Sequence, residues 1–168
     1  VFMVGVGLIG STLLNQLRDQ GPFLKEKRSL EIRIVALANS KKMVFAEDGL
    51  DLNHWQETLR NSSEKSSLDR FVDYMKGANL SNSVFIDNTA SSSVPAKYAE
   101  ILGASISICT PNKIASSSEY EMYRRLKDLA NRKRVAYFFE TNVGAGLPVI
   151  STLNDLIHSG DEILKIEG

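Results

Sequence analysis

Short apolar runs alternate with longer amphipathic segments along the chain. Six runs are rich in valine, isoleucine, leucine and phenylalanine and are bounded by turn residues; they lie at 1–6, 30–37, 84–87, 104–109, 135–139 and 163–166. Such runs are typical of buried strands in parallel sheets. Apolar residues recur at helical spacing in four segments between them, at 8–17, 94–102, 118–131 and 149–157. This order predicts an α/β domain with helices on both faces of the sheet.

Two details complete this prediction. The dipeptide Gly21-Pro22 is expected to end the first helix, because proline lacks a backbone donor and glycine is flexible. The second strand is followed by a polar stretch with two amphipathic segments, one around Trp55 and Leu59 and one over 68–75, separated by a serine-rich loop at 61–67. We predict one domain over residues 1–168, whose end at about 147–168 leads into a further region.

A glycine pattern follows the first predicted strand. Gly5, Gly7 and Gly10 match G-x-G-x-x-G where the strand ends and the first helix begins. The first glycine permits a tight turn, the second lets the backbone approach a pyrophosphate, and the third lets helix and strand pack closely. The free N–H groups of a helix N-terminus, here including Leu8 and Ile9, favour an anion. The pattern predicts a Rossmann-like, doubly wound, mostly parallel sheet that binds a dinucleotide, the alternative being a turn that merely tolerates glycine.

The end of the second strand bears on the choice between NAD and NADP. An acidic residue there would bond the ribose 2′-hydroxyl and repel a 2′-phosphate. This chain instead has Asn39, Ser40, Lys41 and Lys42, and an amide, a hydroxyl and two cations suit a 2′-phosphate. We therefore favour NADP and keep NAD as the alternative. An ordinary solvated basic turn is the other interpretation of the two lysines.

Three further segments follow predicted strands, at the edge where open α/β sheets bind ligands. Residues 87–92 contain small polar side chains that suit cofactor contacts or, equally, a helix cap. Lys113, on a loop that Pro111 fixes, is the best candidate for a functional cation, with an ordinary exposed lysine as the alternative. The loop 140–148 exposes carbonyl oxygens near the Glu140 carboxylate, and oxygen ligands suit a hard cation. A tight turn is the default interpretation of that loop.

Composition narrows the class of protein without identifying it. The 168 residues are 43% hydrophobic and 24% charged, and 20 basic residues balance 20 acidic ones. We therefore expect neither a nucleic-acid nor a membrane partner, because both usually need clustered positive charge or long apolar runs. The single cysteine, Cys109, is expected to be a buried strand residue, and a reducing cytoplasm or plastid stroma fits it. The only histidines, His54 and His158, have no evident partners, and a catalytic histidine–carboxylate pair is the less favoured interpretation.

Four motifs together resemble homoserine dehydrogenase. They are the glycine loop 5–10, Ala38-Asn39-Ser40, Thr110-Pro111-Asn112-Lys113 and, most specifically, the loop 140–148 with the sequence ETNVGAGLP. The segment 49–55 is similar to the form of this enzyme that is fused behind aspartokinase. The resemblance covers essentially the whole chain.

The resemblance implies reduction of aspartate 4-semialdehyde to homoserine with NAD(P)H, in the biosynthesis of threonine, methionine and isoleucine. It places Asn39 and Ser40 at the ribose site and Thr89 and Ala90 on the nicotinamide side. Lys113 matches a cofactor-contacting lysine. A sodium site is implied as well; its ligands are Glu140 and the backbone oxygens of Val143, Ala145 and Leu147.

The resemblance also limits what this segment does. The family's substrate carboxylates and proton-donating lysine lie beyond the position of Gly168, so we expect no catalytic residue here. Both ends resemble cuts from a longer polypeptide, which we expect to bind a small-molecule substrate and to form a homo-oligomer. A different dehydrogenase on the same framework and a non-catalytic nucleotide-binding module are the competing hypotheses.

Overall fold

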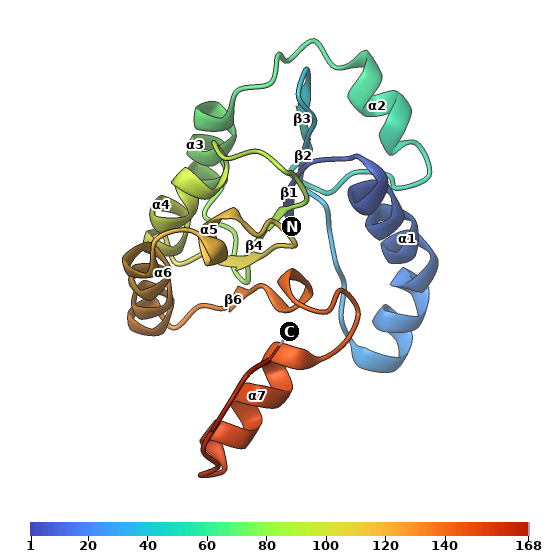
Figure 1. Cartoon of the computed structure of the whole chain (residues 1–168). Coiled ribbons are helices and arrows are strands. Elements are labelled where there is room, and N and C mark those ends of the chain that lie inside the picture. The colour runs from blue at the N-terminus through green and yellow to red at the C-terminus, as the bar shows by residue number, and fades with distance from the viewer. Residues whose placement is uncertain (168) are drawn as a thin grey trace.

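Six strands form the centre of the molecule. The computed structural model describes residues 1–167, and its sheet has the order β3-β2-β1-β4-β5-β6 (Figure 1). The strands are β1 (Phe2–Val4), β2 (Ala36–Ala38), β3 (Met43–Phe45), β4 (Val84–Asp87), β5 (Ser107–Cys109) and β6 (Tyr137–Phe138). All neighbours pair in parallel except β3, which is antiparallel to β2 at the edge. The mostly parallel, doubly wound sheet predicted from the alternation is confirmed.

Helices cover both faces of this sheet. Helices α1 and α2 lie on one face, and α3, α4 and α6 on the other (Figure 1). The helices are α1 (Leu8–Arg28), α2 (Trp55–Asn61), α3 (Leu68–Ala78), α4 (Tyr98–Gly103), α5 (Ile114–Ser117), α6 (Tyr120–Lys133) and α7 (Val149–His158), with short 3-10 turns η1 (Pro95–Lys97) and η2 (Glu140–Asn142). In residues 1–167, every helix is too short or too polar to cross a lipid bilayer.

Alternation along the strands divides the core into two halves. In β1, Phe2 and Val4 pack with α3, α4 and α6, whereas Met3 between them packs with α1 and α2. In β4, Phe85 and Ile86 divide in the same way. Successive side chains of a strand point to opposite faces, so an apolar run of this kind needs a helical layer on each side.

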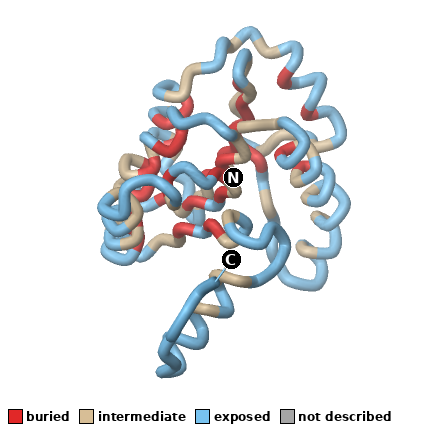
Figure 2. Tube along the Cα trace, viewed as in Figure 1, coloured by how far each residue is buried: buried red, intermediate tan, exposed pale blue. Residues whose placement is uncertain are grey.

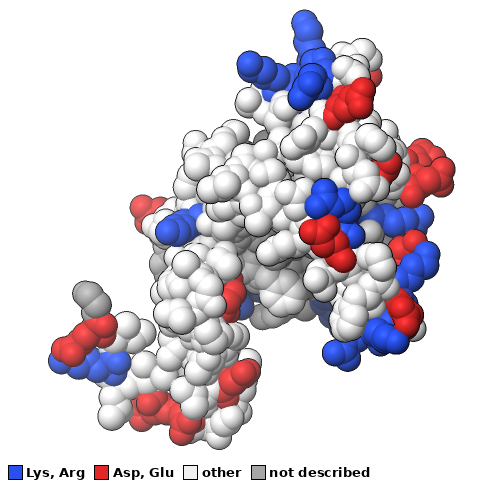
Figure 3. Space-filling view, turned by 90° about the vertical axis from the view of Figure 1, so that its right-hand side faces the viewer, with Lys and Arg blue, Asp and Glu red and all other residues white. Residues whose placement is uncertain are grey.

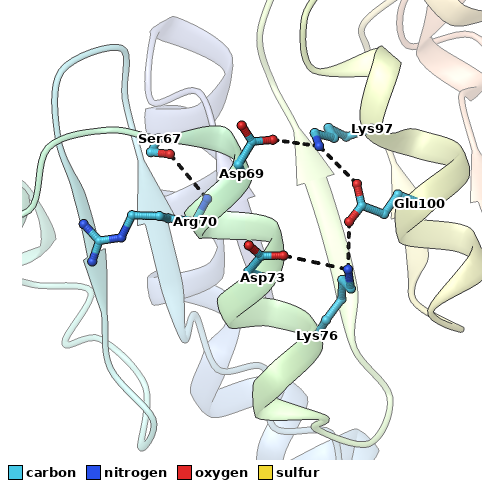
Figure 4. A network of polar contacts seen from close by, with 7 residues as sticks. All are labelled: Ser67, Asp69, Arg70, Asp73, Lys76, Lys97 and Glu100. Atoms are coloured by element: carbon cyan, nitrogen blue, oxygen red, sulfur yellow. Dashed lines mark hydrogen bonds and ion pairs between the residues drawn. The ribbon is translucent and has the colours of Figure 1, made fainter.

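Ion pairs connect α3 to the segment that contains η1 and α4 (Figure 4). The Lys97 ammonium lies 2.7 Å from Asp69 and 3.1 Å from Glu100, and Lys76 lies 2.8 Å from the other oxygen of Glu100. Exposed pairs contribute about 0–1 kcal/mol each. The network therefore adds modestly to the apolar packing between these helices.

The prediction that Gly21-Pro22 ends the first helix is wrong. Helix α1 continues through Pro22 to Arg28. Pro22 is exposed, so water can satisfy the carbonyl that its missing N–H leaves free. The helix ends at Ser29, which has φ 51° and donates its N–H to the Leu24 carbonyl. Such a left-handed residue is a common helix terminus.

The second strand is shorter than predicted, and β3 was not predicted. Of the run 30–37, only the end pairs, in β2. Just after β2, the Asn39 side-chain oxygen accepts hydrogen bonds from the N–H groups of Lys41 and Lys42, at 2.8 and 2.7 Å. This turn reverses the chain, so that Met43–Phe45 pairs back on β2. The polar composition of the turn concealed the strand that follows it.

The last predicted strand, 163–166, is also wrong. Residues 161–167 form no regular structure, because the described chain offers this segment no neighbouring strand. Helix α7 before it extends away from the sheet and has no buried residue (Figures 1 and 2). Acidic and basic side chains are interspersed around the face in Figure 3, whose centre is largely uncharged.

Candidate functional site

The glycine loop joins β1 to α1 at the carboxyl edge of the sheet. Gly5 has φ +88°, a conformation that side chains rarely adopt, and its N–H donates to the Ala38 carbonyl at 2.9 Å. A Cβ atom on Gly10 would lie 2.0 Å from the Gly5 carbonyl oxygen. Gly5 and Gly10 are therefore required by the fold itself, as the motif predicts.

Gly7 differs from the other two glycines. A Cβ atom there would meet no atom within 4 Å, and Gly7 gives α1 no side-chain cap. The next residues, Leu8 and Ile9, are 85% and 56% exposed, and the first turn of α1 contains no acidic residue. The first N–H groups of the helix thus face open space with a positive helix dipole. This arrangement fits the diphosphate of a dinucleotide.

Five predicted residues meet in one pocket of about 510 Å³ beside this loop. Its walls come from the ends of β1 and β2, the start of α3 and the segment after β4. The predicted residues that line it are Gly5, Asn39, Ser40, Thr89 and Ala90. Segments that are far apart in sequence thus form one cavity next to the proposed diphosphate position.

The two lysines after β2 have different environments. The Lys42 ammonium donates to the Arg60 carbonyl, and that contact holds it against the end of α2. Lys41 is exposed, and its ammonium has no ion pair within residues 1–167. Lys41 is therefore the better candidate for a 2′-phosphate, while Asn39 shapes the turn that carries it.

A second pocket, of about 400 Å³, lies on the other side of the loop. Leu8 and Ile9 form one wall with Asn88, and the ends of β5 and β6 contribute Cys109 and Phe138. Cys109 is exposed, so the prediction of a buried cysteine is wrong. Its strand lies near the edge of the sheet, and the pocket leaves one side of the residue uncovered.

A buried polar cluster lies beneath the two loops that follow β4 and β5. The Asp87 carboxylate is 0% exposed and accepts hydrogen bonds from the Tyr98 hydroxyl at 2.6 Å, the Asn112 amide at 3.0 Å and the Thr89 N–H at 2.8 Å. The Thr110 hydroxyl donates to the Asp87 carbonyl at 2.8 Å. Burial, with the neighbouring Asp87 charge, raises the pKa of Tyr98. The sequence analysis did not predict this cluster. Its only sign in the sequence is that polar residues stand at the ends of these strands, which does not show that they contact one another.

Lys113 stands at the start of α5, directly after this cluster. Its side chain is exposed, and the Asn112 side chain before it accepts the Ile114 N–H at 3.1 Å. The backbone on both sides of Lys113 is thereby fixed, while the ammonium remains free of ion pairs within the described residues. The structure leaves its predicted role in cofactor contact open to test.

The Glu140 loop has a structural role that the sequence did not reveal. The Glu140 carboxylate accepts the N–H groups of Ile150 at 2.9 Å and Ser151 at 2.8 Å, so it caps the start of α7. The Leu147 carbonyl accepts the Val149 N–H at 2.9 Å. Each of these oxygens retains a lone pair, so this part of the donor set still fits a cation.

The other two predicted sodium ligands are free. Within residues 1–167, the carbonyls of Val143 and Ala145 accept no hydrogen bond. Ala145 has φ 51°, which gives the loop its irregular backbone. The described residues contain no group of three His, Cys, Asp or Glu side chains that could hold a metal ion, so the ligand set of this loop would consist mainly of backbone oxygens. His54 pairs with Asp51, at 2.7 Å, on an exposed surface, although no partner was expected for it.

Comparison with known proteins identifies the family of this chain. The sequence model described as "Homoserine dehydrogenase, NAD binding domain" matches residues 5–140. The chain belongs to this family. Its residues from the glycine loop to Glu140 thus form an NAD(P)-binding domain of homoserine dehydrogenase, and the resemblance based on the four motifs is confirmed.

Two similar proteins match the whole of this chain and are much longer than it is. The chain is 42% identical to the chloroplastic bifunctional aspartokinase/homoserine dehydrogenase 1 of Arabidopsis thaliana, and the match covers 100% of this chain but 19% of that protein. It is 34% identical to the homoserine dehydrogenase of Schizosaccharomyces pombe, of which it covers 45%. The chain therefore spans less than half the length of these homoserine dehydrogenases.

A solved structure supports the fold independently. A hyperthermophilic archaeal homoserine dehydrogenase in complex with NADPH superposes with a TM-score of 0.72 at 22% identity, over 90% of this chain and 46% of that one. At this identity, the similarity establishes the Rossmann-like fold of the homoserine dehydrogenase domain.

Proposed function

We propose that this chain holds NADPH for an enzyme that reduces aspartate 4-semialdehyde to homoserine. The open N-terminus of α1 above Gly7 carries the proposal, because it adjoins the pocket that Asn39, Ser40, Thr89 and Ala90 line. Family membership supports it, and both relatives named above are homoserine dehydrogenases, one of them fused to aspartokinase.

The order of the strands supports a proposed place for each part of the cofactor. The N–H groups of Leu8, Ile9 and Gly10 hold the diphosphate above β1. The adenosine ribose then lies toward β2, where Asn39 and Ser40 are. The nicotinamide half lies in the opposite direction, toward β4 and β5, whose loops contain Thr89 and Lys113.

The chain's own residues therefore bind and orient the hydride donor. When bound, the reduced nicotinamide supplies the hydride that reduces the carbonyl carbon of the aldehyde, and the oxygen takes up a proton. The donor and the carbonyl must be held within a few ångströms of each other. We assign no proton donor to residues 1–168, and we propose that other parts of the enzyme bind the substrate.

The reaction itself has a direct test. The natural full-length protein is mixed with NADPH and aspartate 4-semialdehyde, and NADPH oxidation is followed by absorbance. We expect turnover that depends on the aldehyde. Tight NADPH binding without turnover would instead favour a non-catalytic nucleotide-binding module, and turnover of a different aldehyde alone would favour another dehydrogenase.

The preference for NADP rests on Lys41. We expect Lys41→Ala to weaken NADPH binding about 10-fold to 150-fold, because a hydrogen bond to a charged group contributes about 1.5–3 kcal/mol. NADH binding should stay within about twofold, since NADH lacks the 2′-phosphate. Lys42→Ala is the matched control, because the Lys42 ammonium contacts the Arg60 carbonyl instead. Equal affinity of the wild type for NADPH and NADH would refute the preference.

A sodium ion on the Glu140 loop is part of the proposal. Its ligands would be the Glu140 carboxylate and the carbonyls of Val143, Ala145 and Leu147. A bound ion would raise the melting temperature of the wild type in sodium chloride above that in choline chloride at equal ionic strength. Glu140→Ala should abolish this difference. The same melting temperature in both salts for the wild type would exclude the site.

The proposal also includes self-association of the enzyme through α7. Helix α7 buries none of its residues, although Leu156 and Ile157 are 40% and 53% exposed. Exposed apolar side chains of this kind are typical of contact surfaces. We propose that they are covered in a homo-oligomer, which sedimentation of the natural full-length protein can test; a monomer at micromolar concentration would contradict this.

A further inference from the structure

The buried carboxylate of Asp87 serves no purpose in the proposed function as described so far. It is 0% exposed, and no Lys or Arg forms an ion pair with it within the described residues. Burying a charge without an opposite charge is costly unless hydrogen bonds compensate. A residue that the fold retains at such a cost needs a structural or functional explanation.

Its hydrogen bonds join the two loops that face the nicotinamide half. One oxygen, Oδ1, accepts the Thr89 N–H from the loop after β4. The other, Oδ2, accepts the Asn112 side-chain amide from the loop after β5. The same amide nitrogen lies 3.0 Å from the Ser91 carbonyl, which adds a second link between the loops.

A third hydrogen-bond donor, from α4, reaches the Asp87 carboxylate. The Tyr98 hydroxyl, at 2.6 Å from Oδ2, comes from α4 and is buried. Its oxygen also lies 3.0 Å from the Thr110 hydroxyl. The Tyr98 hydroxyl has one proton, and the Asp87 carboxylate is both the nearer acceptor and the charged one, so this proton goes to the carboxylate. Every partner that faces the carboxylate is therefore a donor, and the arrangement fixes both loops relative to α4.

We propose that Asp87 is a positioning residue for the nicotinamide half of the cofactor. Through Thr89 and Asn112 it sets the relative position of the two loops, and thereby the place of Lys113 next to Asn112. The inference rests on the proposed function, which places the nicotinamide toward β4 and β5. The adenosine half lies toward β2 and makes no use of these contacts.

Two substitutions perturb this cluster. Asp87→Asn replaces one acceptor by a donor that faces other donors, and Tyr98→Phe removes one donor while it keeps the aromatic ring. Tyr137→Phe is the matched control, because the Tyr137 hydroxyl is also buried but has no hydrogen-bond partner in the described residues. The rings of Tyr98 and Tyr137 lie 5.9 Å apart, so the control probes the same region of the core.

The experiment compares two ligands on the natural full-length protein: NADPH, and 2′-phospho-ADP-ribose, which lacks the nicotinamide. We expect Tyr98→Phe and Asp87→Asn to weaken NADPH at least fivefold and to diminish the fluorescence enhancement of bound NADPH. Binding of 2′-phospho-ADP-ribose should change less than twofold, and Tyr137→Phe should change neither. Tyr98→Phe keeps the test available if Asp87→Asn does not fold.

The outcomes separate this inference from the proposed function. Equal weakening of both ligands would show general damage to the fold and would overturn the positioning role. Unchanged NADPH binding and fluorescence in Tyr98→Phe would overturn it as well. A wild type that binds neither ligand would refute the proposed function itself, and the inference with it.

Discussion

Two glycines of the loop have different roles: we expect Gly10 to be needed for folding and Gly7 for cofactor binding. One substitution at each position can show this. At Gly10, a Cβ atom would lie 2.0 Å from the Gly5 carbonyl oxygen, so Gly10→Ala forces β1 and α1 apart by about 1 Å. Overpacking of this kind costs about 1–3 kcal/mol. For a chain of this size, each kcal/mol lowers the melting temperature by about 2–4 °C. We therefore expect a fall of about 2–12 °C for Gly10→Ala.

Gly7→Ala should behave in the opposite way. Nothing lies within 4 Å of the added methyl group, and the φ of −67° suits alanine. Alanine reduces the entropy of the unfolded chain but is a poorer N-cap than glycine, and the two effects leave stability within about 1 kcal/mol. The methyl group would, however, occupy the position that we propose for the diphosphate. Losing one hydrogen bond to a charged group should weaken NADPH binding about 10-fold to 150-fold.

The assay pairs thermal unfolding, followed by circular dichroism, with NADPH titration of the same samples by calorimetry. Gly21→Ala, in a part of α1 where an added Cβ also meets nothing within 4 Å, is the control for a methyl group away from the loop. Wild-type NADPH affinity in Gly7→Ala would refute the proposed diphosphate position. A fall in its melting temperature as large as that of Gly10→Ala would refute the separation of the two roles.

Two further predictions concern the surface. The hydrogen bond and charge of Asp51 raise the pKa of His54, so their contribution to stability is full below the ordinary histidine pKa and is lost as pH rises through the raised value. Asp51→Asn should return the His54 pKa toward about 6.5 in an NMR titration, and an unchanged value would contradict the pairing. Lys97→Met removes one of the two lysines that contact Glu100 in the network of Figure 4 and should lower the denaturation midpoint only slightly, less still in high salt; a large, salt-independent fall of the midpoint in denaturant titrations would show that packing dominates.

The pattern of the sequence predicts the sheet and the glycine loop because both depend on local rules. Buried parallel strands need apolar residues throughout, and a diphosphate turn needs glycine at fixed positions. The same rules fail where a distant partner decides the structure. The run 163–166 has the composition of a strand, but pairing needs a neighbour that residues 1–167 do not supply.

Polar side chains show the same limit. Glu140 and Asp87 both follow strands, and both were visible as polar residues at a ligand-binding edge. The sequence does not reveal that Glu140 caps α7 or that Asp87 joins the loops after β4 and β5, because Ile150 lies 10 residues from Glu140 and Asn112 lies 25 residues from Asp87 along the chain. Asn39 is different, because its hydrogen-bond partners lie two and three residues away. They form a turn that reverses the chain, so that β3 pairs with β2.

We propose that NADPH lies over the glycine loop with its diphosphate at the start of α1. An NMR titration of the ¹⁵N-labelled chain with NADPH tests it most directly. The account predicts that the largest amide shifts fall on Gly7, Leu8 and Ile9, with smaller ones on Ser40 and Thr89. Unchanged amides in the glycine loop at saturating NADPH, or no binding at all, would contradict it.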